Sequence, residues 1–513
     1  MNKTQTTTIR IVTAASLFDG HDAAINIMRR ILQSKGAEII HLGHNRSVHE
    51  IVECAIEEDA HAIAITSYQG GHIEFFKYMF DMLQEAGCGH IKIFGGGGGT
   101  ILPAEIDELH DYGIEHIYSP DDGRRMGLEG MIEDLLVRAG KSAYFEAAEN
   151  WDNVPPLGES KDIRRIARAI THAELGLPVE GFSLAGKDQS KRALLDEAVV
   201  LGITGTGGAG KSSVTDEIVR RFLHQFPDRT IAVISVDPSR KKTGGALLGD
   251  RIRMNAISHP RAYMRSMATR NDHLALSQTA REAINICRAA GFNLVILESA
   301  GVGQSDASIV DYCDLSLYVM TPEYGAASQL EKINMLDYAD IICINKFDKP
   351  GALDALQDVK KQYRRNHQLW AAKEEDIPVI GTIAAQFNDW GVNELFERIV
   401  KTIEIKTDKS WGRPVVLYAH MNDTTSKTRI IPAKQVRYLS EITEAIKVYD
   451  QWVATQSALA SQLYQLEGAK QLLENAAEMI EAKKQELLVN LEPGNKELID
   501  KWPAIINAYN QDY

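Results

Sequence analysis

Apolar residues recur along the chain at two spacings, one typical of strands and one typical of helices. From Ile9 to about Arg138, short apolar runs alternate with stretches in which apolar residues have helical spacing. This alternation predicts an open parallel sheet with helices on both faces, a flavodoxin-like or Rossmann-like α/β domain whose ligands bind beyond the carboxyl ends of the strands. The expected strands are Ile9–Leu17, Glu38–Leu42, Ala62–Tyr68, Ile91–Phe94 and His116–Tyr118. The expected helices are Ile25–Ser34, Val48–Glu58, Ile73–Glu85 and Pro103–His110.

A second α/β pattern occupies the middle of the chain. The apolar run Ala198–Thr204 predicts a buried strand, and the residues that follow its glycine-rich loop have helical spacing. Three more apolar runs, Thr230–Ile234, Leu294–Leu297 and Ile341–Ile344, predict further buried strands. Beyond Trp411, residues Lys434–Leu491 predict one or two long helices, most simply a helical hairpin, with a coiled coil as the alternative.

The length of the chain and these patterns together suggest how it divides. A chain of 513 residues is too long for one ordinary core, and about three domains are expected. We therefore expect an α/β domain at residues 1–140 and a linker at 141–190 with a short helix at Asp162–Thr171. A second α/β domain at 191–410 and a helical connector or dimerisation arm at 411–513 complete the division.

Composition excludes several classes of protein. The net charge of −14 argues against a general nucleic-acid binder, because such proteins gather Lys and Arg to neutralise phosphates. No apolar run approaches the roughly 20 residues of a membrane helix, and no secretory signal precedes the first expected strand. The five cysteines are scattered without metal-ligand spacing, as in a reduced protein. We expect a cytoplasmic protein with no membrane contact.

The loop after the strand at Ala198–Thr204 carries the most specific motif. Gly205-Thr-Gly-Gly-Ala-Gly-Lys-Ser212 matches the phosphate-binding pattern G-x-x-x-x-G-K-S/T at every constrained position. Its strand, glycine loop and helix follow in the required order, so backbone N–H groups can surround a polyphosphate. Lys211 is expected to reach the β- and γ-phosphates, and the Ser212 hydroxyl is expected to ligate Mg²⁺. The predicted phosphate contacts are Gly207, Gly208, Ala209, Gly210, Lys211 and Ser212.

A second motif selects the base. Asn345-Lys346-Phe347-Asp348 follows a buried strand and matches N-K-x-D, in which the Asp carboxylate accepts hydrogen bonds from two N–H groups of guanine. Adenine lacks these donors and would leave the carboxylate unpaired. Thr382 and Ala384, after another apolar run, are expected to complete the base pocket. The ligand is therefore predicted to be GTP.

The phosphate end of this site is expected to include a sensor loop. Glu298, directly after the strand at Leu294–Leu297, is predicted to hold Mg²⁺ through water, and the Gly301 amide to sense the γ-phosphate. Lys211 and Glu298 are the predicted catalytic residues. Val302 stands where a water-orienting glutamine would serve, so we expect slow hydrolysis or a group supplied by conformational change, with Gln304 as an open candidate.

Two further loops offer charged groups to the metal and the phosphates. Asp237, at the end of the strand at Thr230–Ile234, and Asp250 are predicted members of the Mg²⁺ shell, because hard cations prefer carboxylate oxygen. Arg253 is expected to counter phosphate charge. The glycine-punctuated segment from Lys241 to Met254 is predicted to be a mobile loop, in which Arg251 is expected to be solvated.

Three loops of the amino-terminal domain, each after an expected strand, carry a different pattern. His21 could ligate a metal through one ring nitrogen while Asp19 accepts from the other, although an exposed histidine beside an aspartate is also common. Together, Asp19-x-His21, Ser67 and Gly95-Gly96 resemble the cobalamin-binding domain. The resemblance implies that His21 ligates cobalt, that Asp19 is its hydrogen-bond partner and that Ser67 contacts the displaced nucleotide tail. It also implies that Gly95 and Gly96 allow the tail to approach the backbone.

The second α/β domain resembles the GTPases that guard and load methylmalonyl-CoA mutase. The residues that carry this resemblance are Asp237-Pro-Ser, Thr243-Gly-Gly, Gly249-Asp-Arg-Ile-Arg-Met254, Ser266-Met-Ala-Thr-Arg270 and Glu298-x-x-Gly-Val-Gly-Gln-Ser305. The order of the two domains resembles the fused isobutyryl-CoA mutases. That resemblance implies adenosylcobalamin, GTP and Mg²⁺ as cofactors, a homodimer, and a mutase activity that needs a substrate-binding barrel of roughly 250 residues, absent from this chain.

Two other interpretations stay open. One is a cobalamin-responsive sensor or storage protein in which GTP controls partner binding. The other is a GTPase joined to a flavodoxin-like domain that binds no cofactor.

Overall fold

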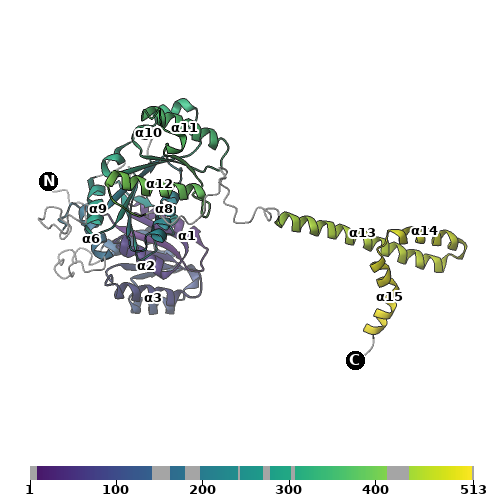
Figure 1. The fold of residues 1–513 in the computed structure, drawn as a ribbon. Helices are drawn as coiled ribbons and strands as arrows, with labels where there is room; N and C mark the ends of the chain where they lie inside the picture. Colours follow the sequence, from purple (N-terminus) through teal and green to yellow (C-terminus); the bar gives the residue numbers. More distant parts are fainter. Residues whose placement is uncertain are drawn as a thin grey trace. The chain divides into compact units, whose positions relative to one another are not determined.

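The structure, a computed structural model, describes residues 8–140, 162–179, 197–240, 243–269, 278–301, 307–412 and 438–510. The chain forms two compact units, Met1–Ser426 and Lys427–Tyr513 (Figure 1). Most of the expected linker, residues 141–161 and 180–190, lies outside the described residues.

The amino-terminal part of the first unit contains a parallel six-stranded sheet of order β5-β4-β3-β1-β2-β8. This confirms the predicted α/β domain, and its first five strands have the flavodoxin-like order. Those strands are β1 (Arg10–Ser16), β2 (Glu38–Arg46), β3 (Ala62–Thr66), β4 (Lys92–Gly96) and β5 (His116–Tyr118). The helices between them are α1 (Asp22–Ser34), α2 (Val48–Glu57), α3 (His72–Glu85) and α4 (Pro103–Tyr112), and α5 (Pro120–Gly140) follows β5.

Alternate residues of these strands enter two cores. Ile11 of β1 lies on the face covered by α1 and α5, where Leu32 and Leu135 are also buried. Its neighbour Val12 lies on the opposite face, in a core with Phe76 of α3. Because the sheet is covered on both faces, its strands direct apolar residues toward both of them, as is usual in parallel sheets.

The second sheet is also parallel, with seven strands in the order β13-β12-β11-β6-β10-β7-β9. It confirms the second predicted α/β domain. Its strands are β6 (Val199–Gly205), β7 (Ile231–Asp237), β9 (Ala262–Ala268), β10 (Leu294–Glu298), β11 (Leu315–Met320), β12 (Ile341–Asn345) and β13 (Val379–Thr382). Its helices are α8 (Lys211–Gln225), α9 (Gln278–Ala289), α10 (Met335–Tyr338), α11 (Ala352–Asn366) and α12 (Trp390–Thr407).

Two elements have partners that the sequence did not indicate. Helix α6 (Ile163–Glu174), expected inside a linker, buries Ile166 and Ile170 in the core of the second sheet. Strand β8 (Ala246–Leu248) belongs by sequence to the second domain, yet it pairs in parallel with β2 of the first sheet. The prediction of a loop for this part of the segment 241–254 was wrong, because these three residues form a sheet edge.

The second unit consists of α13 (Tyr438–Leu472), α14 (Ala477–Asn490) and α15 (Pro493–Tyr509). Helices α13 and α14 contact each other, and the ion pair between Lys470 and Glu481 joins them at 2.6 Å. This confirms the predicted helical hairpin. Leu463 and Ile480 are buried within it, whereas Leu472 is exposed. Throughout the described ranges, we find no helix with the length and apolar character needed to cross a membrane.

Candidate functional site

The loop after β1 is organised by one buried carboxylate. Asp19 is 2% exposed and accepts hydrogen bonds from the backbone N–H of His21 at 2.9 Å and of Tyr68 at 2.7 Å. Its Oδ1 also lies 2.8 Å from Nδ1 of His21. Burial raises the pKa of Asp19, but these hydrogen bonds outweigh burial and hold it below the ordinary value. Asp19 therefore stays ionised and ties the loop after β1 to the loop after β3.

His21 has the arrangement that a metal-ligating histidine needs. Its Nδ1 is occupied by Asp19, its side chain is 75% exposed, and its ring lies 5.5 Å from the ring of Tyr68. A carboxylate on Nδ1 fixes the ring orientation and makes Nε2 a better electron donor. Both residues lie beyond the carboxyl end of β1, beside the point where the strand order reverses, which is where ligands bind in this fold. These residues fit a cobalt ion approached through Nε2.

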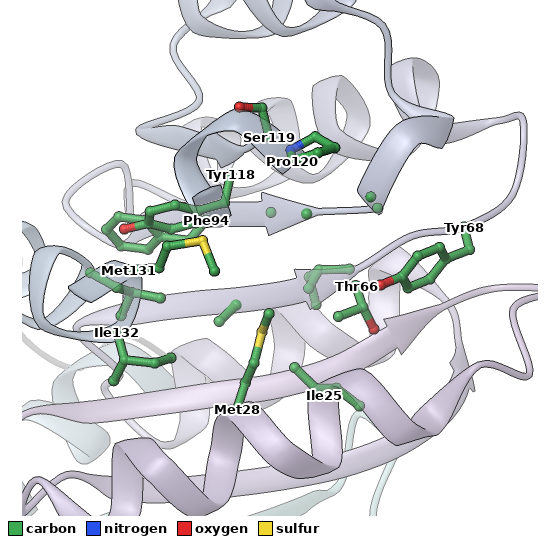
Figure 2. A pocket seen from close by; sticks show the side chains of 18 of the residues that line it. Ile25, Met28, Thr66, Tyr68, Phe94, Tyr118, Ser119, Pro120, Met131 and Ile132 are labelled. Carbon is green, nitrogen blue, oxygen red and sulfur yellow. The ribbon is translucent and has the colours of Figure 1, made fainter. Parts of the chain in front are cut away.

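A largely apolar cavity of about 210 Å³ lies between α1, α5 and the strands β3 and β4. Figure 2 shows Ile25 and Met28 on one side of it and Met131 and Ile132 at one end. Thr66 and Tyr68 lie at the other end, and the buried Thr66 hydroxyl has no hydrogen-bond partner among the described residues. A buried hydroxyl without a partner is costly unless a ligand or water satisfies it. The cavity therefore fits a mainly apolar group with a polar atom that can reach Thr66.

The predicted glycines line this cavity, but the predicted serine does not. Gly95 and Gly96 both line the cavity, whereas Ser67 does not and instead accepts a hydrogen bond from Ser16 at 2.9 Å. The next glycine, Gly97, approaches the loop after β3 so closely that a Cβ would lie 1.9 Å from the carbonyl oxygen of Ser67. Sequence reasoning missed Thr66, Met28 and the other lining residues, because buried residues of this kind are also ordinary core residues.

The P-loop connects β6 to α8 as expected. Gly208 and Gly210 have positive φ angles of 76° and 91°, which favour glycine. Lys211 is buried, and its Nζ donates to the carbonyl oxygen of Gly205 at 3.2 Å, a position from which it can turn to a phosphate. Burial lowers the pKa of Lys211. The loop therefore presents backbone N–H groups and one ammonium group at a helix N-terminus.

The base-recognition residues contact the P-loop and each other. Asn345 donates from Nδ2 to the carbonyl oxygen of Ala209 at 2.9 Å. Its Oδ1 accepts from the Thr382 hydroxyl at 3.2 Å and from the Ala384 N–H at 3.1 Å. Asp348, three residues beyond Asn345, is exposed, so its carboxylate is accessible to a base. The structure thus brings together the predicted residues from three separate loops.

Two carboxylates lie beside the Ser212 hydroxyl, and a third, that of Asp237, interacts electrostatically with both of them. This hydroxyl lies 2.9 Å from Oδ1 of Asp250 and 2.9 Å from Oε1 of Glu298, and the other oxygen of Glu298 accepts from Thr215 at 2.9 Å. Burial, and then Asp250, raise the pKa of Glu298 to about 7. Burial, Asp250 and Glu298 likewise raise the pKa of Asp237 to about 8. Such mutual repulsion is relieved when a cation enters.

The residues described here include no group of three or more His, Cys, Asp or Glu side chains able to hold a metal on its own. A Mg²⁺ ion in a nucleotide site needs fewer protein ligands, because phosphate oxygens and water complete its shell. Ser212 with Asp250 and Glu298 nearby fits that requirement. Arg253 is largely exposed, with Nη1 3.8 Å from Asp250.

The sensor loop begins beside the P-loop. A Cβ on Gly301 would lie 3.1 Å from the Cα of Gly207. Residues 302–306, which include Val302 and Gln304, lie outside the described residues.

The prediction that Arg251 is solvated was wrong. Its side chain is buried, at 7% exposed, and donates hydrogen bonds to Glu57 and Glu58 of the first domain. The two carboxylates are distant in sequence, so local sequence gave no sign of this burial.

The fold and the site define a P-loop GTPase joined to a flavodoxin-like B12-binding domain. Residues 9–117 match the family described as "B12 binding domain", and residues 166–413 match "Methylmalonyl Co-A mutase-associated GTPase MeaB". These matches imply that the chain binds cobalamin and GTP.

Curated relatives extend both matches. The fused isobutyryl-CoA mutase of Geobacillus kaustophilus (strain HTA426) is 51% identical over 504 residues, which are 96% of this chain and 46% of the relative. That of Cupriavidus metallidurans (strain ATCC 43123 / DSM 2839 / NBRC 102507 / CH34) is 51% identical over 508 residues, 98% of this chain and 46% of the relative. The chain is homologous to fused isobutyryl-CoA mutases over their B12-binding and MeaB GTPase portion, and it spans about half of their length.

Proposed function

We propose that the chain is the cobalamin-binding and GTP-hydrolysing portion of an adenosylcobalamin-dependent acyl-CoA mutase of the isobutyryl-CoA to n-butyryl-CoA type. GTP binding and hydrolysis gate the loading and protection of the cofactor. The observation that carries this proposal is the Asp19–His21 pair beside an apolar cavity, on the same compact unit as a guanine-type P-loop site. Mutase turnover would need the substrate-binding (β/α)₈ barrel of the family as a partner.

At the first site, Asp19 would hold the proton of His21 on Nδ1, and Nε2 would be the atom that holds cobalt. The cavity lined by Ile25, Met28 and Met131 would take the nucleotide tail, with Thr66 as its hydrogen-bonding group. Bound adenosylcobalamin would supply a carbon-centred radical by homolysis of its Co–C bond.

At the second site, Lys211 would neutralise the β- and γ-phosphates, and Ser212 would exchange its carboxylate partners for Mg²⁺. Glu298 and Asp250 would hold water molecules of the metal shell. Asp348 would accept from guanine, and the Gly301 amide would respond to the γ-phosphate. The helical arm at 411–513 would connect to the barrel and support a homodimer.

Absorption spectroscopy tests the cofactor assignment. Adenosylcobalamin added to the protein should change its visible spectrum as His21 replaces the dimethylbenzimidazole base on cobalt. The His21→Ala variant should lose this change. His49→Ala provides a matched control, because His49 is an exposed histidine that pairs with Glu53 on the same helix. Equal spectra for the wild-type protein and His21→Ala would contradict the assignment.

Nucleotide competition tests the GTPase assignment. We expect GTP to displace a fluorescent guanine nucleotide at concentrations at least about a hundredfold lower than ATP, because adenine leaves Asp348 unpaired. Equal displacement by ATP would contradict it. Adding a separate mutase barrel then discriminates between mutase chaperone and cobalamin sensor: cofactor transfer that depends on the nucleotide supports the first.

A further inference from the structure

Strand β8 joins the nucleotide site to the sheet of the cobalamin-binding domain. Its residues pair with β2 in parallel register, with Ala246 opposite Glu38 and Leu248 opposite Ile40. The Ala246 N–H donates to the carbonyl oxygen of Ala37 at 3.2 Å, and both Ala246 and Leu248 are fully buried. A segment of the GTPase domain therefore forms the edge strand of the sheet in the cobalamin-binding domain.

The start of this segment lies against the end of α1. A Cβ on Gly245 would lie 2.1 Å from the carbonyl oxygen of Gln33, so only glycine fits this approach. The Thr243 hydroxyl donates to the same oxygen at 3.4 Å. Helix α1 also carries Ile25, Met28 and Leu32, which line the cavity of the cobalamin-binding domain. The segment thus contacts an element of the cofactor site directly.

Two consecutive residues after β8 contact different domains. Asp250 accepts from Ser212 of the P-loop at 2.9 Å and from Ser235 at 2.6 Å. The adjacent Arg251 extends toward the cobalamin-binding domain, where it is bonded to Glu57 and lies 3.3 Å from Oε1 of Glu58. Consecutive residues therefore bind the predicted metal site and the neighbouring domain.

The carboxylate that receives Arg251 is itself fixed. Glu58 is fully buried and accepts from both the backbone N–H and the hydroxyl of Ser266, the latter at 2.8 Å. It also lies 3.6 Å from Nη1 of Arg10 on β1. Buried charges hold such positions because separation would leave them without compensation. Arg251 is therefore attached to a rigid partner.

We propose that Arg251 is a positioning residue for the GTPase. By binding Glu57 and Glu58, and with β8 held against β2, it fixes Asp250 beside Ser212, so that Mg²⁺ binding at the nucleotide site depends on the cobalamin-binding domain. This inference rests on the proposed GTP site. It adds that Arg251, which does not itself contact the metal, sets the Mg²⁺ affinity of that site.

Fluorescence of methylanthraniloyl-GTP bound to the full chain tests this inference. The nucleotide is first titrated in EDTA, which gives its affinity without Mg²⁺. Mg²⁺ is then titrated in a second experiment. Arg251→Met should raise the half-saturating Mg²⁺ concentration at least about tenfold, as loss of an outer-shell partner does, with the affinity in EDTA within about twofold of wild type. Arg251→Lys should restore part of the loss. Arg240→Met, which changes an exposed arginine directly before the segment 241–254, should match wild type.

Gly245→Ala is a second variant in case Arg251→Met fails to fold, since it displaces β8 without removing a charge. It should raise the Mg²⁺ requirement in the same direction. A purely structural role predicts instead a lower melting temperature with an unchanged Mg²⁺ curve in both variants, and that result would overturn the inference. If the wild-type chain bound no methylanthraniloyl-GTP, the proposed GTPase function would be contradicted. That result differs from an unchanged Mg²⁺ curve, which would contradict only the role of Arg251.

Discussion

The substitution Asp19→Asn isolates the role of one buried charge in cofactor binding. The carboxylate receives three donors on two oxygens: Tyr68 N–H on Oδ2, and the His21 N–H and Nδ1 on Oδ1. An asparagine side chain has nearly the same shape, but only one of its two terminal atoms can accept. Either Tyr68 or His21 must therefore face an NH₂ group.

The expected magnitude follows from these contacts. A hydrogen bond to a charged group contributes about 1.5–3 kcal/mol, and loss of a metal ligand's carboxylate partner lowers affinity about 10- to 100-fold. We expect the affinity of Asp19→Asn for adenosylcobalamin to fall within that range, about 1.4–2.7 kcal/mol. Part of this loss arises because a neutral partner makes Nε2 of His21 a weaker ligand.

Absorbance titration with adenosylcobalamin measures this effect, and thermal unfolding reports whether the variant remains folded. Asp22→Asn is the matched control, because Asp22 is exposed and its carboxylate accepts a hydrogen bond from Asn26 on the same helix. The control should bind within about twofold of wild type. Binding of Asp19→Asn at wild-type affinity, with an unchanged spectrum, would refute the role assigned to the carboxylate.

Three further changes test other parts of the account. Asp348→Asn should lower GTP affinity about 10- to 100-fold in competition binding and favour xanthosine triphosphate, whose base offers an acceptor where guanine has a donor. Gly97→Ala should destabilise the protein by about 1–3 kcal/mol in denaturant unfolding, because its Cβ meets the Ser67 carbonyl oxygen, while Gly99→Ala, in open space, should not. Burial lowers the pKa of His61 from 6.5 to about 4, so the unfolded state binds more protons between those values. Stability should therefore fall by up to roughly 3 kcal/mol on acidification through that range, and His61→Gln should flatten the unfolding free energy against pH.

The sequence predicted the two α/β domains well because their signals are local. Each of the strands β1–β5 is an apolar run of its own, and a helix follows it, so alternation alone identifies the fold. The motifs around His21, Lys211 and Asn345 also lie at strand ends, which places them at the binding edge of each sheet.

Pairing between distant segments could not be predicted in this way. Ala246–Leu248 is too short and too close to glycines to be distinguished from a loop, and it becomes a strand only because β2 offers a free edge. The burial of Arg251 depends on Glu57 and Glu58, almost two hundred positions away in the sequence. Met28 and Met131 likewise look like core residues until the fold places a cavity between them.

The central claim is that an imidazole of this chain binds cobalt, and electron paramagnetic resonance tests it most directly. The protein is labelled with ¹⁵N at histidine and loaded with cob(II)alamin, whose unpaired electron couples to the axial nitrogen. Histidine ligation predicts that the triplet splitting seen with unlabelled protein becomes a doublet, and that His21→Ala loses the doublet. A triplet that persists in the labelled protein would show that dimethylbenzimidazole stays on the metal and would contradict the account.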